Sequence, residues 1–157
     1  NGIVCGQGLQ AKLRHDGGQT TGFEKLVIEQ AQNMPKAMAQ AETMQAIKLD
    51  MRQQQAFAKD ALNLRWGNIN ETAENGTFWD SVTMIHANHA KRIEDTSQDL
   101  WTTYNRLQES LITANNIPVI SRTDKGEKTR KAKAIQSLKE TVRLNQGLWD
   151  LAEKAAA

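Results

Sequence analysis

Apolar residues recur every three or four positions along three long stretches of the chain, which is the spacing of one face of an α-helix. The first stretch begins at Thr21, where Thr21 and Glu24 form a capping-box pattern, and it ends before Gly67. Its stripe consists of Val27, Met34, Met38, Ala41, Met44, Met51, Ala58 and Leu62. The pattern predicts a helix over about 22–66. Because proline removes a backbone hydrogen bond, we expect either a kink at Pro35 or a helix that starts near Asn33.

Two further helices are predicted after a loop at 67–76 that is rich in Gly and Asn. The second runs over about 77–115 and ends before Pro118, which cannot continue a helix. Its stripe consists of Phe78, Val82, Ile85, His89, Ile93, Thr96, Leu100, Tyr104, Leu107 and Leu111. The third runs over about 124–155 from an N-cap at Asp124.

Three long helices joined by short connections predict an all-α fold, an elongated antiparallel three-helix bundle. The bundle would occupy 22–157 as one domain, behind an irregular, flexible leader over 1–21. Six of the ten glycines precede residue 23, which supports that division. No strand is predicted, because the apolar run 117–120 is too short to indicate one.

Composition and charge limit the classes of partner and of covalent link that this chain requires, but they do not identify a function. Hydrophobic residues make up 39% of the chain and the formal net charge is +2, which requires neither nucleic acid nor a membrane surface as a partner. No apolar run approaches the roughly 18 residues that would span a bilayer. The single cysteine, Cys5, excludes a disulfide within the chain. The sequence does not identify the localisation, and it favours an extracytoplasmic one, periplasmic or secreted, only slightly. A chain that starts at Asn1 is either a mature form after removal of a signal peptide or a truncated form.

Candidate chemistry is sparse. His86 and His89 are spaced to share a helical face, but a metal site needs more ligands, and Lys91 and Arg92 would repel a cation. No Gly-rich phosphate-binding loop is present, and no serine or cysteine has an evident base beside it. The sequence therefore predicts no catalytic residue, no cofactor and no metal, and a protein that is not an enzyme.

Positive charge is concentrated near the C-terminal third of the chain. The segment 122–143 contains eight basic residues and three acidic ones. Lys128, Arg130, Lys131 and Lys133 are the candidate contacts to an anion or a nucleic acid. The simpler interpretation is a solvated helix face, in which Glu127 and Lys131 form an i, i+4 pair.

These observations favour a helical interaction or structural protein whose partners are other proteins or copies of itself. A subunit of an extracytoplasmic secretion, conjugation or surface-adhesion assembly fits that description. The predicted partner-binding residues are Trp66, Trp79, His89 and Thr96, which comprise two aromatic side chains beside the first loop and two polar positions in an apolar stripe. Nucleic-acid binding or scaffolding by 122–143 is the alternative, and a ligand-sensing bundle with an internal pocket is a further one.

Overall fold

The computed structural model describes residues 20–67 and 76–157, and in that part of the chain it shows a mixed α/β architecture. The elements are α1 (Thr20–Ala46), α2 (Met51–Trp66), β1 (Gly76–Phe78), α3 (Ser81–Ala87), the 3-10 helix η1 (Ile93–Asp95), α4 (Leu100–Thr113), β2 (Pro118–Thr123), β3 (Gly126–Lys131) and α5 (Leu138–Ala156). The prediction of an all-α three-helix bundle is therefore wrong. Of the predicted leader, residues 1–19 lie outside the described residues.

The first predicted helix is two helices, because Asp50 caps a new start. The Asp50 carboxylate accepts the backbone N–H of Gln53 at 2.8 Å, and the Gln53 side chain accepts the backbone N–H of Asp50 at 2.8 Å, which completes a capping box. Just before it, the N–H of Leu49 donates to the carbonyl of Gln98 at 2.8 Å. This backbone hydrogen bond to a distant part of the chain compensates for the interruption of the helix between Ala46 and Met51. α1 runs through Pro35 to Ala46.

The second predicted helix is divided in the same way. Asp80 and Asp99 are the N-caps of α3 and α4, and each carboxylate accepts a backbone N–H three residues on. Between these helices the chain forms a loop that contains η1. Thr96, which the apolar spacing placed within the second helix, lies in this loop.

The predicted third helix begins 14 residues too early, because the segment before Leu138 contains an antiparallel hairpin of β2 and β3. Thr123 pairs with Gly126, and Gly126 adopts a φ of 106°, a conformation that glycine reaches without steric cost. β1 adds to the other edge of β2, which makes a three-stranded sheet in the order β1-β2-β3. α5 starts only at Leu138, and the hydroxyl of its N-cap residue Ser137 accepts the N–H of Glu140 at 3.4 Å.

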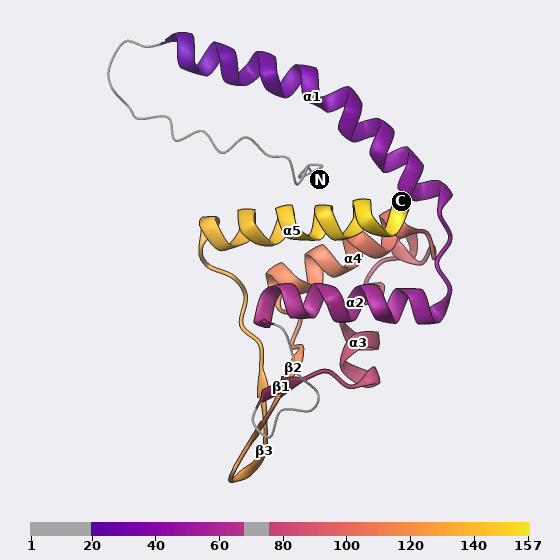
Figure 1. Cartoon of the computed structure of the whole chain (residues 1–157), viewed down its shortest axis with the longest axis vertical. Coiled ribbons are helices and arrows are strands. Elements are labelled where there is room, and N and C mark those ends of the chain that lie inside the picture. Colours follow the sequence, from indigo (N-terminus) through magenta and orange to yellow (C-terminus); the bar gives the residue numbers. More distant parts are fainter. Residues whose placement is uncertain (1–19, 68–75) are drawn as a thin grey trace.

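The helical body consists of α2, α4 and α5, which lie against one another, with α3 beside α2 and α4 (Figure 1). Its core contains mainly Leu, Ala and aromatic side chains, including Phe57, Leu62, Leu100, Tyr104, Leu107, Leu111, Leu144, Leu148 and Trp149. Trp149 packs edge-on against Tyr104, with ring centroids 5.9 Å apart. The hairpin and the first half of α1 extend from opposite ends of this body (Figure 1). These two extensions and the α2–α3–α4 junction are the features that can carry a function.

Candidate functional site

The β2–β3 hairpin gathers most of the predicted anion-binding residues. Residues 118–133 contain six basic and two acidic side chains, so this segment has a formal charge of +4. Lys128, Arg130 and Lys131 lie on β3 and Lys133 follows it, and all four are exposed. The sequence grouped these residues correctly as one basic segment, but it assigned them to the wrong secondary structure.

Side-chain alternation divides the β3 cations between the two faces of the sheet. Lys128 is opposite Ser121 and Arg130 is opposite Val119, so both belong to one face, whereas Lys131 belongs to the other. On that other face Arg122 is already engaged: its guanidinium contacts Glu127 at 2.9 Å and lies 4.8 Å from the centre of the Phe78 ring. Among the described residues, no ion pair engages Lys128, Arg130 or Lys131.

The base of the hairpin is held firmly by the helical body. Val119 is fully buried, and Arg65 of α2 donates to the backbone carbonyls of Leu111 and Lys133, on either side of the hairpin. The partial burial of this guanidinium lowers the pKa of Arg65. Ala132 also donates to the carbonyl of Ile117 at 2.9 Å. The cations of β3 therefore lie on a hairpin whose base is attached to the helical body. β3 is an edge strand of the sheet, so no other strand of the sheet pairs with its outer side.

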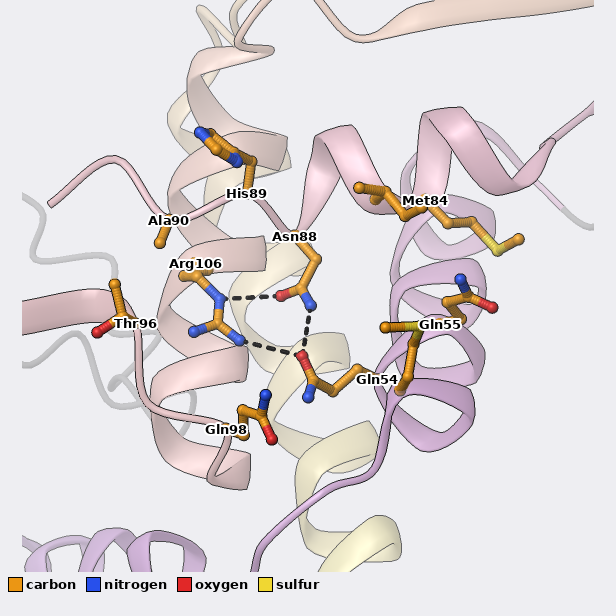
Figure 2. Close-up of a pocket in the computed structure, with 11 residues that line it drawn as sticks. Gln54, Gln55, Met84, Asn88, His89, Ala90, Thr96, Gln98 and Arg106 are labelled. Atoms are coloured by element: carbon orange, nitrogen blue, oxygen red, sulfur yellow. Dashed lines mark hydrogen bonds between the residues drawn. The ribbon is translucent and has the colours of Figure 1, made fainter. Parts of the chain in front are cut away.

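A second candidate site is a cavity of about 310 Å³ at the junction of α2, α3 and α4, which we call the Arg106 cavity (Figure 2). Its walls include Met51 and Gln54 of α2, Met84 of α3, Asn88 and His89 just after α3, and Arg106 of α4. Thr96 and Gln98 come from the loop that precedes α4. The cavity thus lies between α2 and the part of the chain that runs from α3 through the loop into α4.

Arg106 lies at the centre of a hydrogen-bond network in this cavity (Figure 2). Its Nε donates to Asn88 Oδ1 at 3.0 Å, and its Nη2 donates to Gln54 Oε1 at 3.4 Å and to Thr103 Oγ1 at 3.1 Å. Asn88 Nδ2 also donates to Gln54 Oε1 at 3.0 Å. Nη1 donates to the backbone carbonyls of Asp95 and Ser97, so one guanidinium fastens the loop before α4.

The charge of Arg106 is buried without a contacting carboxylate. Its side chain is only 6% exposed, and within the described part of the chain no carboxylate oxygen lies within 4 Å of it. Burial lowers the pKa of Arg106, and the more distant charges of Asp99 and Asp95 offset this only in part. Burial also raises the pKa of Asp99, but hydrogen bonds from Ser97 and Thr102 outweigh that effect, so the pKa of Asp99 lies below its usual 3.8.

The four predicted partner-binding residues fall into two separate groups. His89 and Thr96 both line the Arg106 cavity, and the His89 side chain is exposed. Trp66 and Trp79 contact each other with ring centroids 5.4 Å apart. Trp79 is 5% exposed and its indole N–H donates to Asn63 at 3.0 Å, so its ring belongs to the core.

Sequence reasoning missed the residues at the centre of the cavity, which are Arg106, Gln54 and Asn88. One signal was available for Arg106, because it is adjacent to Leu107 and three residues after Thr103, on the side of α4 that faces the core. A charged residue on such a face needs buried partners. Gln54 and Asn88 carried no comparable signal, since each is one polar residue among many.

Two further features of the described residues concern metal-ligating side chains and membrane-spanning helices. No group of three or more His, Cys, Asp or Glu side chains is placed there to hold an ion, and the imidazole of His86 instead contacts the backbone carbonyl of Asn115 at 2.8 Å. Of the helices that the structure describes, none combines the length and the apolar character needed to cross a membrane.

Comparison with known proteins identifies relatives of the chain. A family model described as "Domain of unknown function (DUF932)" matches residues 1–149. The UPF0380 protein YfjQ of Escherichia coli (strain K12) is 31% identical over 154 residues, which cover 98% of this chain and 52% of that protein. The UPF0380 protein YafZ of the same organism is 30% identical over 154 residues, with the same coverage. The chain thus spans about half the length of these relatives. No solved structure matches it.

Proposed function

We propose that this chain, which belongs to the DUF932 family of domains of unknown function, is a non-enzymatic binding domain that contacts nucleic acid through its β2–β3 hairpin. One observation carries the proposal: cations without ion-pair partners among the described residues are exposed on an element that projects from the body. The non-enzymatic part rests on the sequence, in which no phosphate-binding loop or activated nucleophile is evident.

The distribution of charge favours the hairpin over the rest of the surface. The whole chain has a formal charge of +2 and residues 118–133 contribute +4, so the remainder carries −2. A polyanion is therefore attracted to the hairpin and weakly repelled elsewhere. Lysine on an exposed edge strand also prevents pairing with another strand, which is the competing explanation for the same residues.

The proposal predicts a strong dependence on salt. Each phosphate neutralised on duplex DNA contributes about −0.9 to the slope of log affinity against log salt, so four cations give a slope of about −3.6. Between 50 and 200 mM salt, that slope lowers the affinity by about 150-fold. Single-stranded DNA gives a shallower slope, of about −2.8.

The test replaces Lys128, Arg130, Lys131 and Lys133 together with glutamine and measures binding of labelled duplex and single-stranded oligonucleotides by fluorescence anisotropy at several salt concentrations. A matched control replaces four exposed cations outside the hairpin, Lys25, Lys36, Arg52 and Lys154. We expect the hairpin variant to lose most of its affinity and salt dependence, and the control to keep both.

Equal losses in the two variants would mean that binding reflects overall charge, and absence of binding in the unmodified chain would refute the proposal. If the hairpin variant instead binds normally and self-associates in size-exclusion chromatography, the lysines serve to protect the strand edge.

A second candidate function is protein contact through α1. Val27, Ile28, Met34 and Met38 are 49% to 57% exposed on this helix, a clustering of apolar side chains that is typical of a contact surface. A partner protein or a second copy of the chain would cover them, as a component of a secretion, conjugation or adhesion assembly requires. Size-exclusion chromatography with light scattering tests self-association: a monomer at all concentrations excludes it, and an oligomer that Met34→Ser and Met38→Ser dissociate supports it.

A further inference from the structure

The Arg106 cavity combines an apolar wall with a positively charged interior. Met51, Met84 and Ile85 supply the wall, and Met51 and Ile85 remain more than half exposed. Of the residues that line the cavity in the described part of the chain, none is acidic. The cavity volume of about 310 Å³ is at the lower end of the range for small-molecule sites, which admits a small ligand.

Hydrogen-bond donors remain available at the cavity. A carboxamide nitrogen carries two hydrogens, and the described contacts use one on Asn88, to Gln54, and one on Gln54, to the carbonyl of Leu49. The side chains of Gln55, Gln98 and His89 make no hydrogen bond to other described residues. These amide and imidazole groups can therefore bind an acceptor without breaking a hydrogen bond of Arg106, whose own N–H groups are all engaged.

The field in the cavity favours a negative ligand. The guanidinium of Arg106 contacts only neutral oxygens and is the one charged group that lines the cavity among the described residues, so it makes the potential at the cavity wall positive. The carboxylates of Asp99 and Asp95, which do not line the cavity, reduce this potential from farther away. The same potential repels a cationic ligand. An anion can also replace the long 3.4 Å contact between Arg106 Nη2 and Gln54 Oε1 with a charge-assisted hydrogen bond.

We propose that the Arg106 cavity is a binding site for a small organic anion. The apolar part of the ligand lies against Met51, Met84 and Ile85, and its negative group faces Arg106 and the free amide hydrogens of Gln54 and Asn88. This site uses no residue of the hairpin, so it is independent of the proposed nucleic-acid contact. The competing explanation is that Arg106 only fastens the loop before α4.

Two probes with the same aromatic ring system and opposite charge separate these explanations. We would titrate the full chain with 1-naphthoate and with 1-naphthylmethylammonium by isothermal titration calorimetry. The expected result is saturable 1:1 binding of 1-naphthoate and binding of the cation that is at least about tenfold weaker. Equal binding of both probes, or no saturable binding of 1-naphthoate at millimolar concentrations, would overturn the proposal.

Variants at Gln98 then locate the site without disturbing the Arg106 network, because Gln98 is exposed and its side chain makes no described hydrogen bond. We expect Gln98→Glu to weaken binding of 1-naphthoate by about fivefold or more, and Gln98→Lys to strengthen it, as charges a few ångströms from the ligand would do. Gln45→Glu makes the same charge change at an exposed position of α1 that does not line the cavity, and it should have no effect. Equal effects of Gln98→Glu and Gln45→Glu would place the anion elsewhere. The quadruple hairpin variant should retain 1-naphthoate binding, so this proposal and the nucleic-acid proposal can fail separately.

Discussion

Replacement of Gly147 by alanine should destabilise the protein although it improves the helix propensity of α5. A Cβ at this position would lie 2.6 Å from Cδ1, 2.7 Å from Cδ2 and 3.1 Å from Cγ of Leu64 on α2. Ordinary contacts between carbon atoms are about 3.5–4.0 Å, so Leu64 or the two helices must move. Overpacking of this kind costs about 1–3 kcal/mol, whereas glycine to alanine in a helix contributes about 1 kcal/mol. We expect the free energy of unfolding to fall by about 1 kcal/mol.

A double-mutant cycle with Leu64→Ala isolates the contact. Without the leucine side chain the clash disappears, so Gly147→Ala should then raise the free energy of unfolding by about 1 kcal/mol, the propensity gain alone. Urea unfolding followed by tryptophan fluorescence measures all four proteins, since the chain contains four tryptophans. If Gly147→Ala stabilises the unmodified protein as much as it stabilises the Leu64→Ala variant, the close approach of α2 and α5 is incorrect.

Three further predictions concern individual polar or strained positions. Because the pKa of Asp99 is lowered in the folded state, its contribution to stability is present above the unfolded-state pKa and is lost as the pH falls through the folded pKa. Asp99→Asn, which retains the N-cap, should reduce the loss of urea stability on acidification below about pH 4, and an unchanged pH profile would contradict this. Ser110 has a fully buried hydroxyl with no hydrogen-bond partner in the described part of the chain, so Ser110→Ala should leave the melting temperature unchanged or raise it. Asn116 is exposed at a φ of 56°, so Asn116→Ile should cost about 1–2 kcal/mol in urea unfolding and Asn116→Gly should cost almost nothing; equal costs would argue against the left-handed conformation.

The amphipathic segments were predictable because their signal is local. The stripe residues Met44, Ala58, Leu62, Leu100 and Leu107 are buried, as their spacing indicated. Other members of the same stripes are exposed, among them Met34, Met38, Met51, Val82, Ile85 and Ile93. The clustering of basic residues was also visible in the sequence. Spacing could not show where one helix ends and the next begins, because the apolar stripe passes over Asp50 and Asp99 without interruption.

Candidate sites were predictable only in part, for a related reason. His89 and Thr96 drew attention as polar positions in an apolar stripe, and both line the Arg106 cavity. The cavity itself joins α2, α3 and α4, and no local pattern reports which helices meet. The hairpin likewise depends on pairing between β2 and β3. Both faces of β3 are exposed, so its sequence lacks the alternation of apolar and polar residues by which a half-buried strand is recognised.

By itself the sequence determined that most of the chain is helical and where the positive charge is concentrated, because each depends on a few neighbouring residues. Only the tertiary structure decided which caps interrupt a helix. At Asp50, continuing the helix would forgo the bonds from Leu49 to Gln98 and from Leu100 to Ile47, which join segments about 50 residues apart. Such long-range contacts outweigh local helix propensity, which is worth less than about 1 kcal/mol per residue. As a result, the protein has a helical body with a projecting basic hairpin and a charged cavity in place of the three long helices that the sequence predicted.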